Sequence, residues 1–397
     1  MKPFRNIFNT KEKSSFFTKC LSLYFMLMLC DIFNIAEAGT ILKFYAIGLI
    51  FVSIFYLRNA IVVMDATFIA QIGYIGLCFI SLSYSISFNS SLSTLITLVM
   101  NFGLVILCQS IKFTEHEVGT LKRSLVIGGA IIMIASLFFA DFSEAGRLTI
   151  KILGDSADQN ELNGYLLFAF GYFAYSAINN KKNKLLSFVA LFLILLFVFA
   201  TGSRGALLSF LAIITALLLI KARGSRKNII RVIVFILLLL IALQFILSLL
   251  PEDIAIRFSL EYIEDSGTTS RTKIWDALLT RFFKDDTFTL FFGKGFHTTA
   301  IYNTYDDHVA HNTFIDVLIG TGFVGLLLYA VLIISILKKA WDSENYMLFA
   351  TFCGFVVLMM SLSLTTYKPI FNTFIIVEIA YRTFTRNKQK VAEEQAT

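Results

Sequence analysis

Apolar runs of membrane length recur along most of the chain and constrain its fold more than any other sequence feature. Of the 397 residues, 57% are hydrophobic, 42 are Phe and only 3 are Pro. A soluble core cannot bury so much apolar surface. A bilayer offers backbone groups no water, so each span must be a helix or part of a closed barrel, and runs of about 17–22 apolar residues without two-residue alternation select helices. We therefore predict an all-α, polytopic integral membrane protein with about 12 transmembrane helices and one large extracytoplasmic loop.

The hydropathy pattern divides the chain into three parts. Residues 1–250 hold the first nine predicted spans, 251–311 form the predicted extracytoplasmic loop, and 312–397 hold the last three spans and a cytoplasmic tail. The predicted spans are 16–36, 41–57, 61–86, 92–111, 121–140, 161–178, 185–201, 203–220, 229–250, 312–337, 345–365 and 369–383.

The distribution of Lys and Arg predicts the orientation. With both termini in the cytoplasm, 23 of the 34 Lys and Arg residues fall on the cytoplasmic side. Short cytoplasmic connections retain these residues, so this arrangement places 251–310 outside the cytoplasm. The same distribution explains the net charge of +7. It argues against nucleic-acid binding, which would require the basic residues to gather on one face of a soluble domain.

The N-terminal region leaves a question of processing open. Basic residues precede an apolar run that ends at Ala36-Glu37-Ala38, which resembles a secretory signal with a small-residue cleavage site. Asp31 and Asn34 interrupt the apolar run just upstream, which favours a retained first span.

Ionisable residues inside predicted spans cost roughly 2.5–3.5 kcal/mol each on insertion scales, so they call for partners. Glu378 and Arg382 are four residues apart near the cytoplasmic end of the last span, which predicts a local salt bridge. Asp65 lies close to the inner surface, where it either snorkels or meets Arg58.

The long loop contains one predicted helix, at 271–282. Ile274, Leu278 and Leu279 recur on one face with Trp275 beside them, a pattern that suits a helix lying across the mouth of the bundle. A loop helix that merely packs against the bundle would show the same apolar pattern.

Three of the four histidines, His297, His308 and His311, lie in or at the end of this loop. The spacing of His308 and His311 could bind a divalent metal in a helix, but no second His pair or HExxH-type motif accompanies them, and we predict no metal site. A histidine titrates near physiological pH and can act as a general base. His311 is the better candidate because it lies at the entry of a span, where Asp316 either orients its ring or contacts another span.

Two arginines are predicted at the same outer face. Arg204 stands in Thr201-Gly202-Ser203-Arg204-Gly205, a polar break between two apolar runs. The glycines permit a tight turn, and the guanidinium presents a fork suited to phosphate. Arg271 begins the predicted loop helix. Each arginine has a plainer interpretation: a snorkelling anchor for Arg204, and for Arg271 a solvated ion pair worth under about 1 kcal/mol.

In this order and topology the motifs resemble the O-antigen ligase and O-antigen polymerase superfamily, which consists of multi-spanning glycosyltransferases of the GT-C type. The resemblance covers about 160–380 of the sequence. The segments that carry it are Thr201-Gly202-Ser203-Arg204-Gly205, Arg271 with Trp275, Gly293-Lys294-Gly295, His311-Asn312 and Gly320-Thr321-Gly322-Phe323-Val324-Gly325. Asp158-Gln159-Asn160-Glu161 also resembles a polar segment of family polymerases, although a plain span cap would look the same.

The resemblance implies a metal-independent, inverting enzyme that needs no cofactor. It would transfer a preassembled oligosaccharide from a polyprenyl (undecaprenyl) diphosphate carrier to a hydroxyl of an acceptor glycan or glycolipid, outside the cytoplasm. Arg204 and Arg271 would hold the donor diphosphate, and His311 would deprotonate or orient the acceptor hydroxyl. The expected supporting residues are Ser203, Asn312 and Asp316. The implied location is the bacterial inner membrane, with a chain-length regulator protein as a further partner.

A polymerase and a ligase remain alternatives. A polymerase uses a second carrier-linked repeat as acceptor, whereas a ligase uses a sugar of the lipid A core, and both need the same Arg and His residues. The segment 158–161 favours a polymerase, by resemblance alone. A lipid or glycan transporter would also have about 12 spans, but it would place broken or charged helices near mid-membrane in both halves. Here the polar residues gather at the outer rim.

Overall fold

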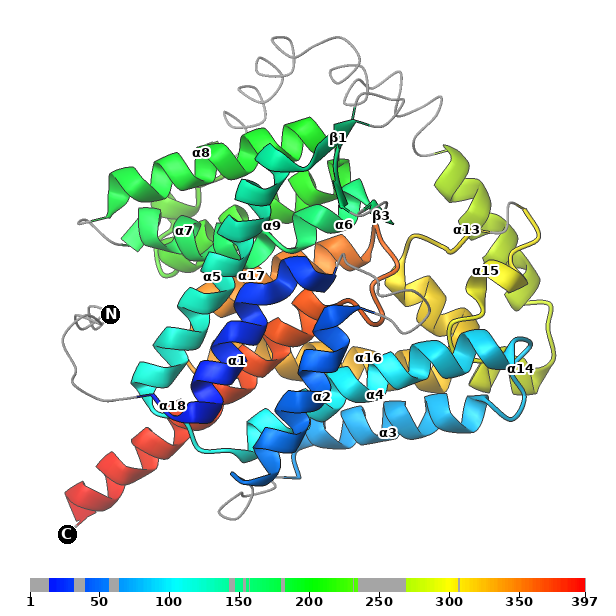
Figure 1. Cartoon of the computed structure of the whole chain (residues 1–397), viewed down its shortest axis with the longest axis horizontal. Helices are drawn as coiled ribbons and strands as arrows, with labels where there is room; N and C mark the ends of the chain where they lie inside the picture. Colours follow the sequence, from blue (N-terminus) through cyan, green and yellow to red (C-terminus); the bar gives the residue numbers. More distant parts are fainter. Residues whose placement is uncertain are drawn as a thin grey trace.

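The computed structural model describes residues 14–31, 40–56, 64–142, 147–152, 155–156, 158–179, 183–230, 232–234, 269–305 and 308–396. These residues form a bundle of helices, as predicted, with one small sheet (Figure 1). The elements are α1 (Phe16–Met26), the 3-10 helix η1 (Leu27–Asp31), α2 (Ile41–Ile54), α3 (Ala66–Ser81), α4 (Phe88–Ser110), α5 (Glu115–Phe138), β1 (Ala140–Phe142), β2 (Leu148–Ile152), β3 (Asp155–Ser156), α6 (Gln159–Gly164), α7 (Leu167–Asn179), α8 (Lys184–Thr201), α9 (Arg204–Ala222), α13 (Thr269–Phe282), α14 (Thr287–Phe292), α15 (Thr299–Tyr302), α16 (Thr313–Asp342), α17 (Tyr346–Met359) and α18 (Lys368–Ala396).

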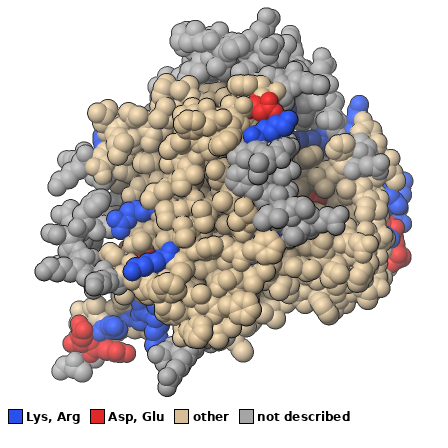
Figure 2. Space-filling model, viewed as in Figure 1, with Lys and Arg blue, Asp and Glu red and all other residues tan. Residues whose placement is uncertain are grey.

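Five of the described helices, α4, α5, α8, α9 and α16, are long and apolar enough to cross a membrane. Large apolar side chains face outward on several of them, including Leu137 and Leu185, which are both 79% exposed. Figure 2 shows wide areas of one face without Lys, Arg, Asp or Glu, which lie mainly toward its margins. Such a surface suits acyl chains rather than water. These features fit an all-α membrane protein. The number of 12 spans stays a prediction, and most of the span predicted at 229–250 lies outside the described residues.

The segment between α5 and α6 connects the spans predicted at 121–140 and 161–178. It forms a three-stranded antiparallel sheet in the order β1-β2-β3, with Ala140 opposite Ile150 and Lys151 opposite Ser156. Strands this short show too little alternation to be recognised from sequence.

The span predicted at 161–178 is also divided, into α6 and α7. The break follows Asn163 and Gly164, both weak helix formers. A Cβ at Gly164 would lie 2.4 Å from the Tyr367 hydroxyl, so only glycine lets the turn approach that ring.

Close helix packing holds α17 at the centre of the molecule, where it packs along α9 and against α7. A Cβ at Gly171 on α7 would lie 2.0 Å from Thr351 Oγ1, and one at Gly354 on α17 would lie 2.6 Å from Ile213. The glycines therefore allow the backbones to approach, as is common between membrane helices. The turn after α17 is consequently fixed beside the start of α9.

A buried ionic cluster joins α3, α16 and α18 at the predicted cytoplasmic end. Lys339 Nζ lies 2.7 Å from Asp65 and 2.6 Å from Glu378, and Arg382 lies 3.5 Å from each carboxylate. The predicted Glu378–Arg382 salt bridge is confirmed. Asp65 pairs with Lys339 and Arg382, and its predicted partner Arg58 lies outside the described residues.

The predicted loop helix is confirmed as α13, which packs on α16 through a small apolar core. Ile274 and Leu278 are 4% and 1% exposed, so the predicted apolar face is the buried one. Near its end, the guanidinium carbon of Arg281 lies 4.1 Å from the centre of the Tyr302 ring, and Arg281 donates a hydrogen bond to the Tyr302 carbonyl. This packing positions α13 beside the N-terminal part of α16 (Figure 1).

Candidate active site

Arg204 is the first residue of α9, directly after the break that ends α8. Gly202 adopts a φ of 61°, a left-handed conformation that favours glycine, and so makes the predicted tight turn possible. Ser203 caps α9 by accepting a hydrogen bond from the Ala206 N–H at 3.4 Å. A Cβ at Gly205 would lie 2.3 Å from Ser361 Oγ, so the start of α9 packs on the turn after α17. Arg204 is thus held, half-buried, at a helix N-terminus whose dipole favours an anion.

Arg147 and two asparagines brace this break. Arg147 Nε donates to the Thr201 carbonyl at 2.8 Å, and its Nη2 donates to Asn160 Oδ1 at 2.9 Å. Asn163 Nδ2 donates to Thr201 Oγ1 at 2.8 Å. The polar segment at 158–161 therefore joins the break that carries Arg204. No local sequence pattern marks this contact of Arg147.

Arg271 lies in the first turn of α13 and is half-buried. Burial and the positive charge of Arg204 lower the pKa of Arg271, and Asp158 opposes this shift. Such an influence weakens with distance, so the two guanidinium groups lie within electrostatic reach of each other. Both stay charged at neutral pH because arginine does not lose its proton in proteins. Neighbouring fixed cations of this kind suit a ligand with two phosphates.

His311 occupies the turn that leads into α16 and has a φ of 48°, a strained conformation for a residue other than glycine. The preceding residue, Ala310, is held from two sides. Its carbonyl accepts a hydrogen bond from Trp275 Nε1 at 2.7 Å, and its N–H donates to Asp316 Oδ1 at 3.2 Å. Asp316 therefore fixes the backbone of the turn. Strain that the surroundings enforce in this way is common at functional sites.

Asn312 caps α16 and connects it to the turn after α17. Its Oδ1 accepts hydrogen bonds from the N–H groups of Phe314 and Ile315 at 3.0 and 3.2 Å. Its Nδ2 donates to the Met360 carbonyl at 3.3 Å. The next residue, Thr313, donates to the Leu362 carbonyl at 2.7 Å. The start of α16 is therefore attached to the same turn on which the start of α9 packs.

The turn at 360–364 and Trp275 bring the three predicted residues to one rim of the bundle. The turn connects the helix starts beside Arg204 and His311, and Trp275 connects the helix of Arg271 to the turn of His311. In Figure 1 the starts of α13 and α16 lie on the same side of the molecule as the sheet and α6. The three predicted residues are thus linked through shared contacts at this end of the bundle.

The glycines at 293–295 have a packing role beside this rim. A Cβ at Gly293 would lie 2.4 Å from the Gly320 backbone, and Gly295 N–H donates to the Gly320 carbonyl at 3.0 Å. Within α16, Gly322 interrupts the helical conformation with a φ of 65°. These glycines let the loop lie against the backbone of α16, which steadies the helix that begins after His311.

The other loop histidines make backbone contacts elsewhere. The His297 carbonyl accepts a hydrogen bond from Ser90 Oγ at 3.1 Å, and the His308 carbonyl accepts one from Asn303 Nδ2 at 2.8 Å. Within the part of the chain that the structure describes, no group of three His, Cys, Asp or Glu side chains is arranged to hold a metal ion. Residues 306–307, next to His308, lie outside that part.

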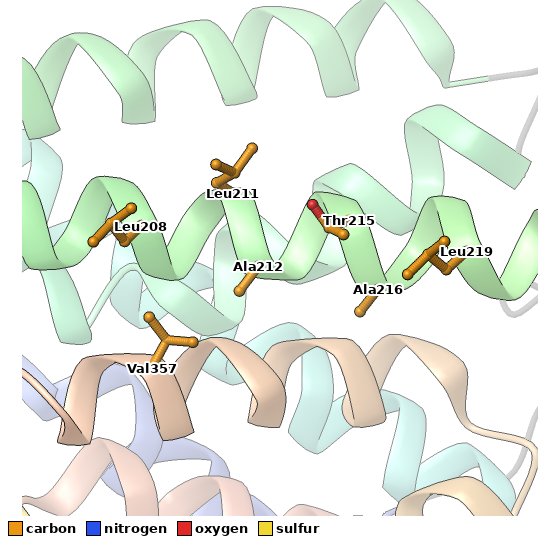
Figure 3. Close-up of a pocket in the computed structure, with 7 residues that line it drawn as sticks. All are labelled: Leu208, Leu211, Ala212, Thr215, Ala216, Leu219 and Val357. Atoms are coloured by element: carbon orange, nitrogen blue, oxygen red, sulfur yellow. The ribbon is translucent and has the colours of Figure 1, made fainter. Parts of the chain in front are cut away.

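An apolar groove runs along α9 beside α17. Figure 3 shows its side chains spaced along α9, with Val357 of α17 opposite them. The groove is lined by Leu208, Leu211, Ala212, Thr215, Ala216, Leu219 and Val357. Leu208 lies one turn after Arg204, and a second hollow that shares Ala216 continues to Arg223. The groove therefore offers a hydrocarbon chain an apolar path that starts near Arg204.

Residues 189–330 match the family model described as O-antigen ligase. The matched segment begins in α8, ends in α16 and contains Arg204, Arg271 and His311. No curated protein was found to match the chain. The match over residues 189–330 shows that this part of the chain is similar to the O-antigen ligase family, and it supports the resemblance to the O-antigen ligase and O-antigen polymerase superfamily.

Proposed function

We propose that this protein transfers a preassembled oligosaccharide from polyprenyl diphosphate to a hydroxyl of an acceptor glycan at the outer face of the membrane. The observation that carries the proposal is the set of contacts that link the helix start of Arg204, the helix of Arg271 and the strained turn of His311. Fixed positive charge suits a diphosphate leaving group, and an imidazole suits an incoming hydroxyl.

In the proposed reaction the acceptor oxygen attacks the anomeric carbon with inversion. The bond from that carbon to the phosphate oxygen breaks, and its electron pair goes to the diphosphate. Arg204 and Arg271 stabilise the charge that grows on this leaving group. His311 deprotonates or orients the acceptor hydroxyl. The scheme uses neither a metal nor a cofactor.

The groove along α9 supports a lipid-linked donor. With the diphosphate at Arg204, the polyprenyl chain would continue into the membrane past Leu208, Ala212 and Ala216. Apolar side chains line this path, so the polyprenyl chain can pass from the bilayer along α9 without entering water.

We place the protein in the bacterial inner membrane, with both termini in the cytoplasm and the site on the opposite face. The inward excess of Lys and Arg supports this orientation. A chain-length regulator protein is a proposed partner.

The acceptor is proposed to be a second carrier-linked repeat, which makes the enzyme a polymerase, and the ligase alternative uses the lipid A core. The resemblance of the 158–161 segment to a polar segment of family polymerases favours the polymerase. The surface glycan of a deletion strain separates the two. Loss of a polymerase leaves cores that carry one repeat, whereas loss of a ligase leaves full-length polymer on its carrier.

The direct test uses purified protein with a carrier-linked oligosaccharide and an acceptor. His311→Ala should abolish formation of the new glycosidic bond while membrane insertion and yield are unchanged. His297→Ala is the matched control, since it removes an exposed loop imidazole that also sits at a positive φ, 59°. Full transfer activity in His311→Ala would overturn the proposal. Movement of substrate across vesicles without bond formation would indicate a transporter instead.

A further inference from the structure

The proposed reaction gives Glu161 no role, although this residue lies on α6, the short helix that braces the break before Arg204. The neighbouring side chains of α6 hold that helix in place. Asn163 donates to Thr201 Oγ1 at 2.8 Å, and Asn160 accepts a hydrogen bond from Arg147 at 2.9 Å. Glu161 is therefore positioned by the same contacts that position the start of α9.

The backbone of Glu161 is fixed, whereas its carboxyl group is accessible. The Glu161 N–H donates to Asp158 Oδ1 at 3.1 Å, and its carbonyl accepts a hydrogen bond from the Tyr367 hydroxyl. The side chain is exposed. Among the described residues, no hydrogen bond to its carboxyl oxygens is found. An accessible carboxyl on a fixed backbone can contact a substrate without first breaking an internal bond.

The charges around Glu161 favour its protonated form. Although the side chain is exposed at the surface, the surrounding protein removes part of the hydration of its carboxyl group. This desolvation, followed by the negative charges of Asp158 and Asp31, raises the pKa of Glu161 to about 7. The nearby cations are engaged: Lys368 pairs with Asp31, and Arg147 binds the break. The hydroxyl groups that face this region belong to Tyr165, which donates to Asp31 at 3.1 Å, and to Tyr367.

Asp158 interacts electrostatically with both Glu161 and Arg271. Its charge acts on Arg271 and also on Glu161, so all three lie within electrostatic reach at one rim. Fixed positive charge and an accessible carboxyl thus occur together. A carboxyl that is partly ionised at neutral pH is a suitable general base.

We infer that Glu161 accepts the proton of the acceptor hydroxyl, while His311 orients that hydroxyl; this inference rests on the proposed function. In the step, the proton passes from the acceptor oxygen to the Glu161 carboxylate. The oxygen forms its bond to the anomeric carbon, and the electron pair of the broken carbon–oxygen bond goes to the diphosphate beside Arg204 and Arg271. The choice of proton acceptor follows from the accessible carboxyl on its fixed backbone.

The test is the pH dependence of the transfer rate in the purified full-length protein. Wild-type activity should rise with pH through about 7, because only the ionised carboxyl accepts the proton. Glu161→Gln should lower the rate about 100-fold or more and abolish this rise. Glu161→Asp should keep a rise at reduced rate, since the shorter side chain still carries a carboxylate. Asp141→Asn removes a carboxylate of β1 whose side chain is 47% exposed, and it should leave rate and profile unchanged.

Two results would overturn this inference. One is a Glu161→Gln protein that folds normally and keeps the rise in rate near pH 7. The other is loss of that rise in His311→Gln but not in Glu161→Gln, which would make His311 the base. Failure of the proposed function is distinguishable, because then Arg204→Lys and His311→Ala would also retain full activity.

Discussion

Trp275 Nε1 donates a hydrogen bond to the Ala310 carbonyl at 2.7 Å, and this contact attaches α13 to the turn of His311. Ala310 is fully buried, and its N–H is bound by Asp316. Arg271 lies one turn before Trp275 on α13. The position of Arg271, a proposed ligand of the donor, therefore depends on the same contact that fixes the turn of His311.

Trp275→Phe should lower the transfer rate about 10- to 100-fold, because it keeps an aromatic ring in the packing but removes the hydrogen bond to Ala310. A misplacement of about 1 Å at a reacting group can cost roughly 100-fold. The free energy of unfolding should fall by only about 1 kcal/mol, as for one neutral hydrogen bond. Transfer assays and thermal unfolding measure the two effects.

The control for this variant is Trp341→Phe, because the chain has only 2 tryptophans and the second stacks with Arg223 at the far end of α16. Equal losses of activity in the two variants would argue against a specific role for the contact with Ala310.

Arg204→Lys and Arg271→Lys should each lower the rate about 10-fold or more, since removal of one donor to a developing charge costs roughly 100- to 1000-fold and lysine retains the charge. Lysine loses the planar fork that binds two oxygens at once. The double variant should lose less than the product of the single losses, because both side chains are proposed to bind the same diphosphate. Exposed Arg226→Lys is the control at the other end of α9. Strictly multiplicative losses would mean that the two arginines act independently.

Asn312→Ala should destabilise the protein by about 1 kcal/mol or more, because it removes the cap of α16. It also removes the bond to Met360. Asn312→Asp keeps the capping oxygen but cannot donate to the Met360 carbonyl, so its unfolding temperature should lie between those of Asn312→Ala and the wild type. If Asn312→Asp is no more stable than Asn312→Ala, the cap contributes little to the fold.

Local sequence patterns correctly predicted α13 and the tight turn between α8 and α9. The apolar periodicity of Ile274 and Leu278 identified α13 and its buried face. The glycines of the Thr201–Gly205 motif indicated the tight turn between α8 and α9, and the structure has a left-handed residue there, Gly202. In each case the interactions that decide the structure lie within a few residues of one another.

The contacts that assemble the site are not local, and no sequence pattern marks them. Arg147, just before β2, binds Thr201 at the end of α8, and Asn312 binds Met360 in the turn that follows α17. Each depends on how complete helices pack. For the same reason the sequence shows Glu161 only as part of a polar segment. One of the charges that raise its pKa comes from Asp31, which lies at the end of η1, far earlier in the chain.

The ionic cluster at the opposite end gives a test of stability that is independent of the chemistry. Glu378 is 0% exposed, and it shares Lys339 with Asp65. Glu378→Leu would leave two buried cations with a single carboxylate, so we expect it to destabilise the protein by about 3–5 kcal/mol. The unfolding temperature in detergent measures this loss.

Adding Lys339→Met to Glu378→Leu should recover much of the lost stability. The double variant leaves Asp65 and Arg382, which lie 3.5 Å apart, as a balanced pair. Replacing a buried ion pair by apolar side chains of similar size is often neutral, whereas removing one partner leaves an uncompensated charge. The single losses should therefore not add. Lys339 lies near the end of α16, whereas His311 precedes its start, so transfer activity per folded molecule should stay unchanged. Additive losses of stability would show that the four charges do not act as one cluster.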